Sequence, residues 1–285
     1  MQNITIGKYV PYNSIIHRLD PRYKILAMIV LMVCIFFSFS SLWMNFIVYG
    51  ILMIFIYIIM RISHIKLSML FSQLKAIWIM MFVLFIVNII VPGDASLGYF
   101  TFFNTGWKIY YSAIYNTVYI LFRLIIMLSL SLVLTATTKP LELTNALEFL
   151  MKPLKAIKFP VHEIAMTISL ALRFIPTLLE ETDRIMKAQA SRGVDFQNGK
   201  FKEKIKAIIA LIIPLFISAL ARSEDLANAM EARGYNPSAK RTKYRINKWA
   251  LRDSIASVII LFILGGLITL MITNFDLVTF IQGLF

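Results

Sequence analysis

Long uncharged, apolar segments separated by short polar stretches dominate the first half of the chain. No charged residue occurs in residues 25–60, a run of 36. A single helix of that length would overshoot a bilayer core of about 30 Å. A Ser-Phe-Ser-Ser patch at residues 38–41 lies near the middle of the run. The pattern therefore predicts a tight hairpin between two short membrane spans.

Three more apolar segments have the length of a membrane-spanning helix. They cover about residues 67–91, 109–138 and 254–274. The first ends at Pro92-Gly93-Asp94, and a polar, aromatic loop follows it. With the two short spans, the chain is predicted to cross the membrane five times.

Arg123 lies near the middle of the fourth predicted span. A charge at that depth is costly, so the side chain should face protein or water. We expect a structural arginine, paired with backbone carbonyls or with another helix. A role in transport is the alternative.

The positions of Lys and Arg predict the orientation of the spans. Four lie in residues 1–24 and 20 of the 29 in residues 139–253, whereas the tail after Arg252 has none. Cytoplasmic loops carry an excess of Lys and Arg. The N-terminus and the 139–253 block are therefore predicted to be cytoplasmic and the C-terminus to lie outside. Five spans agree with this, because an odd number of spans places the two termini on opposite sides of the membrane.

One apolar segment inside the basic block challenges this topology. Residues 207–221 are 15 uncharged residues, fewer than the roughly 18 of a usual span, and Lys and Arg flank both ends. We predict that this segment does not cross the membrane but lies along the inner interface or against another subunit. Residues 161–187 form a milder amphipathic helical pattern of the same kind.

Both amphipathic patterns end in the same frame, Ala-x-x-(Ser/Ala)-Arg-Gly, at residues 188–193 and again at 229–234. Gly193 and Gly234 suit the left-handed position that follows a helix, and Pro237 reinforces the second stop. An arginine in the last turn also favours the negative end of the helix dipole. Two ordinary helix caps are therefore the simplest interpretation.

Helix capping does not explain why the residues that precede the two arginines, Ser191 and Ala232, are small. Small residues beside a long cation suit a helix tip inserted into a groove, where arginine can contact a carboxylate with two hydrogen bonds. Two such tips suggest two equivalent grooves and hence a dimeric partner. Pro176 and Pro214 lie inside the two patterns and should kink or break each helix, as a fixed bend or as a hinge.

Composition agrees with a membrane protein and provides no evidence for an enzyme. The chain is 59% hydrophobic and 15% charged, with mean hydropathy +0.75 and net charge +14. The single cysteine, Cys34, excludes an intrachain disulfide, and the three histidines are scattered without metal-ligand spacing. No Walker A pattern occurs, so the chain is not expected to hydrolyse ATP.

These residues resemble those of the transmembrane T components of energy-coupling factor (ECF) transporters, the CbiQ/EcfT family. The resemblance covers nearly the whole chain, and Ser191 departs from it because the family usually has alanine there. The matching stretches are residues 17–22 (His-Arg-Leu-Asp-Pro-Arg), 173–176 (Arg-Phe-Ile-Pro), 180–181 (Glu-Glu), 189–193 (Gln-Ala-Ser-Arg-Gly), 222–227 (Arg-Ser-Glu-Asp-Leu-Ala) and 231–235 (Glu-Ala-Arg-Gly-Tyr).

The resemblance implies an all-α integral membrane protein with about five transmembrane helices and a cytoplasmic or interfacial coupling domain of long amphipathic helices. The expected division is residues 1–138, 139–253 and 254–285. It also implies a complex in the cell membrane with two ABC-type ATPases, which would bind ATP and Mg²⁺, and with a substrate-binding S component for a vitamin or a metal ion. This chain itself would bind no cofactor, metal or nucleic acid.

The resemblance further implies two sets of contact residues. The set expected to dock into the ATPases is Ser191, Arg192, Gly193, Ala232, Arg233 and Gly234. The set expected to contact the S component is Ile164, Ile168, Leu172, Ile175, Leu179, Ile208, Leu211, Ile212, Leu215 and Phe216.

Two other functions stay open as alternatives. A lipid-modifying membrane enzyme would need clustered acids, metal ligands or an activated nucleophile, but the acidic residues here are dispersed. A membrane anchor for ribosomes or nucleic acid would use the basic excess of residues 139–253, where 20 Lys/Arg minus 12 Asp/Glu leaves +8. Positive-inside placement and anionic lipid already account for that excess.

Overall fold

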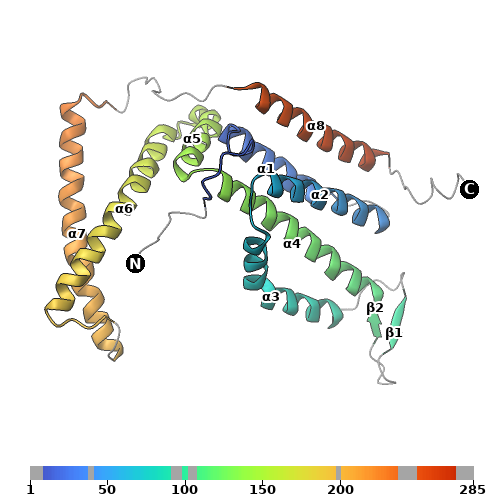
Figure 1. Cartoon of the computed structure of the whole chain (residues 1–285), viewed down its shortest axis with the longest axis horizontal. Coiled ribbons are helices and arrows are strands. Elements are labelled where there is room, and N and C mark those ends of the chain that lie inside the picture. Colours follow the sequence, from blue (N-terminus) through green and yellow to red (C-terminus); the bar gives the residue numbers. More distant parts are fainter. Residues whose placement is uncertain are drawn as a thin grey trace, which may run out of the picture. The chain divides into compact units, whose positions relative to one another are not determined.

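The fold is almost entirely helical in the residues that the computed structural model of this chain describes, which are 9–37, 42–90, 98–101, 108–196, 200–236 and 249–273 (Figure 1). The helices are α1 (Pro21–Ile35), α2 (Leu42–Ile62), α3 (Leu67–Ile90), α4 (Tyr111–Thr137), α5 (Pro140–Leu150), the 3₁₀ helix η2 (Lys152–Ile157), α6 (Val161–Ser191), α7 (Phe201–Ala232) and α8 (Leu251–Ile272). Two short antiparallel strands, β1 (Tyr99–Thr101) and β2 (Lys108–Tyr110), pair Tyr99 with Tyr110.

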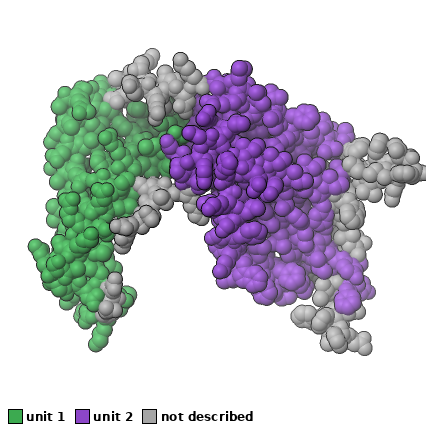
Figure 2. Space-filling view, viewed as in Figure 1, with its two compact units in different colours: residues 1–6, 140–246 green, residues 7–139, 247–285 purple. Residues whose placement is uncertain are grey.

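The chain divides into two compact units (Figure 2). The bundle unit comprises residues 7–139 and 247–285, and the helix-pair unit comprises residues 1–6 and 140–246. In the bundle unit α4 packs against α1, α2 and α3, and α1 also packs against α8. In the helix-pair unit α6 packs against both α5 and α7.

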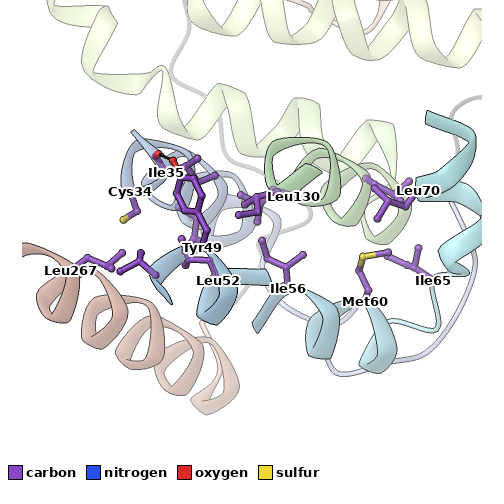
Figure 3. Close-up of a cluster of buried hydrophobic side chains, with 14 of the residues drawn as sticks. Cys34, Ile35, Tyr49, Leu52, Ile56, Met60, Ile65, Leu70, Leu130 and Leu267 are labelled. Carbon is purple, nitrogen blue, oxygen red and sulfur yellow. Dashed lines mark hydrogen bonds between the residues drawn. The ribbon is translucent and has the colours of Figure 1, made fainter. Parts of the chain in front are cut away.

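The core of the bundle unit lies between α1, α2, α4 and α8 (Figure 3). Ile35, Tyr49 and Leu130 are buried there, and Leu267 of α8 joins them. In contrast, Leu70 is the one fully buried residue of α3, because most of that helix points outward. An apolar helix with so little burial suits a lipid-facing position.

Buried polar contacts fix the start of α1. The carboxylate of Asp20 accepts a hydrogen bond from the backbone N–H of Arg22 at 2.9 Å, so Asp20 is the N-cap and Pro21 the first helical residue, as predicted. The backbone N–H of Asp20 donates in turn to Oδ1 of Asp253 at 2.9 Å. This contact ties α1 to the first turn of α8.

Arg123 is paired with tyrosines, and no carboxylate among the described residues pairs with it. Its guanidinium donates to the hydroxyls of Tyr49 on α2 at 3.3 Å and of Tyr119 at 2.8 Å. It also lies over the rings of Tyr119 and Phe36, 4.7 and 4.9 Å from their centroids. The hydrogen bond to Tyr49 on α2 and the cation–π contacts favour the structural interpretation of this charge.

The helices agree with an all-α, multi-pass membrane protein. Six of them are long and apolar enough to cross a membrane by length and composition: α2 from Met44, α3, α4, α6, α7 and α8. The five predicted spans correspond to α1, α2, α3, α4 and α8, of which α1 has only 15 residues. Because α6 and α7 also qualify, the non-crossing course of residues 207–221 stays a prediction based on the flanking charges.

Three predicted turn signals lie outside the described residues. They are the hairpin at residues 38–41, the stop at Pro92-Gly93-Asp94 and Pro237 after the second helix end. Pro176 and Pro214 lie inside α6 and α7, and both helices continue through them. Of the two predicted effects, a break is therefore wrong, whereas a kink, as a fixed bend or as a hinge, stays a prediction.

Candidate functional site

The two longest helices of the chain, α6 and α7, cross within the helix-pair unit (Figure 1). Two polar contacts join them. Ser218 and Arg222 of α7 both donate to the carboxylate of Glu181 on α6. The Glu181 side chain is largely buried and the Arg222 side chain is about one-third exposed, so water screens this ion pair only in part.

The ion pair joins equivalent positions of the repeated sequence. Glu181 precedes Arg192 by 11 residues, and Arg222 precedes Arg233 by the same 11. Eleven residues of helix correspond to about 16 Å on each side of the contact. The helices run in opposite directions, so their C-terminal ends lie on opposite sides of the crossing (Figure 1). The crossing thus brings equivalent positions of the two helices together.

Both helices end in the same backbone motif. After α6, Gly193 N–H donates to the carbonyl of Ala190 at 3.0 Å and Val194 N–H to that of Gln189 at 3.1 Å. After α7, the corresponding bonds run from Gly234 to Glu231 at 2.8 Å and from Tyr235 to Met230 at 3.0 Å. This is the Schellman arrangement, which requires a left-handed residue after the helix.

The two glycines supply that left-handed residue. Gly193 has φ 88° and Gly234 has φ 71°, as the sequence predicted. Backbone bonds close both ends, and within the described residues neither Arg192 nor Arg233 makes a side-chain hydrogen bond or an ion pair. The arginine side chains are therefore not needed to cap the helices.

All six residues expected at the docking tips are exposed: Ser191, Arg192, Gly193, Ala232, Arg233 and Gly234. The hydroxyl of Ser191 donates to the carbonyl of Lys187 at 3.1 Å, one turn back. Its hydrogen bond is thus satisfied within the helix, and the residue presents a surface almost as small as that of Ala232. Each tip offers one long cation flanked by small residues.

The ten apolar residues expected to contact the S component differ in exposure. Five are exposed: Ile168 and Ile175 on α6, and Ile208, Ile212 and Phe216 on α7. Five are half-buried: Ile164, Leu172, Leu179, Leu211 and Leu215. The expected face is therefore partly turned into the helix-pair unit and partly available to a partner.

The apolar surface of α7 is wider than the sequence pattern indicated. Ala207 is its one fully buried residue. Five further large side chains are exposed beside the expected face: Ile205, Ile209, Ile213, Ile217 and Leu220. The helical pattern missed them because residues 207–221 are apolar on every side, so that no single face stands out.

Glu181, Ser218 and Arg222 are the contacts at the crossing that sequence reasoning missed. The equal spacing of Glu181 and Arg222 from the two arginine tips is the signal that could have found them. Among the described residues, no group of three or more His, Cys, Asp and Glu side chains is placed to hold a metal ion.

Comparison with known proteins gives one consistent result. The model of the CbiQ family, described as "Cobalt transport protein", matches residues 12–244. The chain is 44% identical over 265 residues to the energy-coupling factor transporter transmembrane protein EcfT of Bacillus subtilis, covering 92% of this chain and 96% of that protein. It is 42% identical over 257 residues to EcfT of Macrococcus caseolyticus, covering 90% and 94%. It is 40% identical over 258 residues to EcfT of Staphylococcus aureus, covering 90% and 93%.

Proposed function

Because the chain belongs to the CbiQ/EcfT family of transmembrane components of energy-coupling factor transporters, we propose that it is the energy-coupling subunit of such a transporter. It links ATP hydrolysis by two ABC-type ATPases to movement of a substrate-binding S component in the membrane, for uptake of a vitamin or a metal ion. The ATPases bind ATP and Mg²⁺, and this chain has no catalytic role.

The pair of equivalent, exposed arginine tips is the observation that carries this proposal. Arg192 and Arg233 follow identical helix ends and have no side-chain partner within the described residues. A guanidinium flanked by small residues can enter a groove and bind a carboxylate with two hydrogen bonds. Two such tips suit two copies of one groove, as a dimer of similar ATPases would supply.

The crossing of α6 and α7 suggests how movement of the ATPases reaches the S component. Glu181 and Arg222 hold the two helices together at positions equally far from their tips. When ATP binding brings the two ATPases closer, the tips move with them and the helices rotate about this contact. The apolar surface of the pair then moves as well.

The apolar surface of α6 and α7 is the proposed contact with the S component. Ile212 and Phe216 are exposed to 54% and 62%, beside other large apolar side chains. An apolar area of this extent needs lipid or a protein partner. An S component seated on it could slide as the helices turn, since apolar contacts lack directional bonds.

Substitution of the tips tests the proposal. We expect Arg192→Ala or Arg233→Ala to weaken co-purification with the ATPases, and the double variant to lower both co-purification and substrate uptake at least tenfold. Arg184→Ala is the matched control, because Arg184 is an exposed arginine of α6 that lies away from the tip. Membrane insertion should be unchanged in all variants.

Two outcomes would contradict the proposal. One is a double variant that binds its ATPases and supports uptake at the level of the unsubstituted protein. The other is an equal loss in Arg184→Ala, which would mean that general positive charge and not the tip binds the ATPases.

A further inference from the structure

A cavity of about 780 Å³ lies within the bundle unit, separate from the arginine tips. It is bounded by α1, α2, α4, α8 and the segment that precedes α1. This volume falls within the roughly 300–1,000 Å³ that small-molecule sites usually have. Most of the lining is apolar, as at Leu31, Phe55, Leu130 and Ile260.

The cavity has one apolar and one polar end. The helices α1 and α8 begin at the polar end, where the backbone N–H of Asp20 bonds to Asp253. The helix α4 ends at the same place. Its last residue, Thr137, accepts a hydrogen bond from the ammonium group of Lys24 at 3.0 Å. From Tyr23 to Leu31 the lining of α1 extends about 12 Å, close to the roughly 15 Å of one leaflet of a 30 Å bilayer core.

Two arginines line the polar end. Arg18 lies two residues before Asp20, and Arg252 immediately precedes Asp253. Because Asp20 and Asp253 are hydrogen-bonded, both arginines lie at the same end of the cavity. Both are exposed, and within the described residues neither makes a side-chain hydrogen bond or an ion pair. Lys24 differs, because its ammonium group already donates to His17, Thr137 and Thr138. The two arginines are the cations available to a ligand.

Other polar groups mark the same end. The buried hydroxyls of Tyr23 and Thr137, both cavity-lining residues, have no hydrogen-bond partner within the described part of the chain. Trp249 packs edge-on against Tyr23, with ring centroids 6.4 Å apart, and is 60% exposed. Tryptophan is enriched at the level of the lipid headgroups. The polar end therefore lies where a headgroup would be.

We propose that this cavity binds one anionic phospholipid, with an acyl chain between α2 and α8 and the phosphate at Arg18 and Arg252. The apolar part of the cavity fits a hydrocarbon chain, and its depth is about that of one leaflet of the bilayer core. The two arginines fit a phosphodiester that carries a net negative charge. A lipid with a zwitterionic headgroup would gain less from them, since its own cation repels the arginines.

Lipid retention by the purified full-length chain tests this proposal. Native mass spectrometry is carried out after adding phosphatidylglycerol and phosphatidylcholine with identical acyl chains at equal concentrations. We expect one retained phosphatidylglycerol in preference to phosphatidylcholine. In Arg18→Gln/Arg252→Gln, retention of phosphatidylglycerol should fall roughly 25-fold, since each basic residue near an anionic lipid contributes about a factor of five.

Matched variants distinguish lipid binding in the cavity from attraction to positive charge elsewhere and from binding to exposed apolar surface. Arg61→Gln/Lys66→Gln removes two exposed cations of the bundle unit that do not line the cavity, and should leave retention unchanged. Ala256→Phe fills the apolar part of the cavity and should lower the retention of both lipids. Val258→Phe, on an exposed position of α8 outside the cavity, should have no effect.

Three results would overturn the proposal: equal retention of both lipids by the unsubstituted chain, undiminished phosphatidylglycerol in the double arginine variant, or equal losses in Ala256→Phe and Val258→Phe.

A second experiment uses the unsubstituted chain, so that it does not depend on whether the variants fold. A phosphatidylglycerol with a photoreactive acyl chain should label residues 55–62 and 255–260, and excess unlabelled phosphatidylglycerol, but not phosphatidylcholine, should suppress that labelling. Labelling that neither lipid suppresses contradicts a specific site.

Discussion

The helices α2 of the bundle unit and α7 of the helix-pair unit contain equally apolar segments but bury them to different extents. In α2, Val48, Tyr49, Leu52 and Ile56 are each less than 5% exposed. In α7, an equally aliphatic helix, Ala207 is the one buried residue. Many apolar side chains of α2 pack into the core, whereas those of α7, like most of those of α3, stay available to lipid or to a partner. Hydrophobic content alone therefore does not distinguish a core helix from a contact helix.

The polar contacts differ in the same way. In the bundle unit, the buried side chains of Lys24 and Asp253 bond to backbone atoms of distant segments, at Thr137 and Asp20 respectively. In the helix-pair unit, one carboxylate, that of Glu181, carries the polar contact between α6 and α7. The first arrangement fixes one packing, while the second holds two helices at one point and leaves their ends free.

The largest expected difference between the units comes from shortening an isoleucine. Ile126 of α4 is fully buried and Ile213 of α7 is 54% exposed. We expect Ile126→Ala to lower the free energy of unfolding by about 3 kcal/mol, since it leaves a cavity in the core. Ile213→Ala should change it by less than about 0.5 kcal/mol. Thermal unfolding in one detergent measures both, and equal losses would remove the distinction between the units.

A smaller effect is expected at the crossing of α6 and α7. Glu181→Gln should weaken the half-buried ion pair with Arg222 by about 1 kcal/mol, because the amide keeps the shape but not the charge. Uptake by the assembled transporter should fall while the thermal stability of the bundle unit stays unchanged. The charge-exchanged variant Glu181→Arg/Arg222→Glu should recover part of the loss. No recovery would mean that the contact does not join the helices through its charges.

The smallest expected effect is a pH dependence within the bundle unit. Burial lowers the pKa of His17, as do the nearby charges of Lys24 and His64, and the hydrogen bond to the Val10 carbonyl offsets this only in part. Because the folded pKa lies below the unfolded one, protonation disfavours the fold, so stability should fall as the pH drops below about 6.5. Melting temperatures at pH 7.5 and 5.5 test this. His17→Gln should show a smaller drop, and an equal drop would assign the effect to other groups.

Local chemistry explains what could be predicted from the sequence. The candidate spans α2, α3, α4 and α8 follow from long apolar runs, and the N-cap at Asp20 follows from its position before Pro21. The two helix ends follow from Gly193 and Gly234, since few other residues adopt a positive φ there. Each of these signals lies within a few residues of the feature it predicts.

The unpredicted features depend on segments that are far apart in the sequence. The bond from Lys24 to Thr137 joins residues 113 apart, and Arg222 reaches Glu181 across 41 residues. The paired strands β1 and β2 arise in a loop that showed no strand pattern. The exposure of Ile213 and Ile217 could not be predicted either, because the sequence pattern of an apolar segment is the same whether its side chains are buried or exposed.

The prolines of α6 and α7 lie on the side of the crossing away from the arginine tips. Pro176 lies five residues before Glu181, and Pro214 lies eight residues before Arg222, so both precede the crossing. Between the crossing and each arginine, residues 181–192 and 222–233 contain neither proline nor glycine. Proline removes a backbone hydrogen bond and lowers the bending stiffness of a helix. In the proposed coupling, each tip is therefore the end of a stiff helical segment, and bending is concentrated at the prolines, on the other side of the crossing.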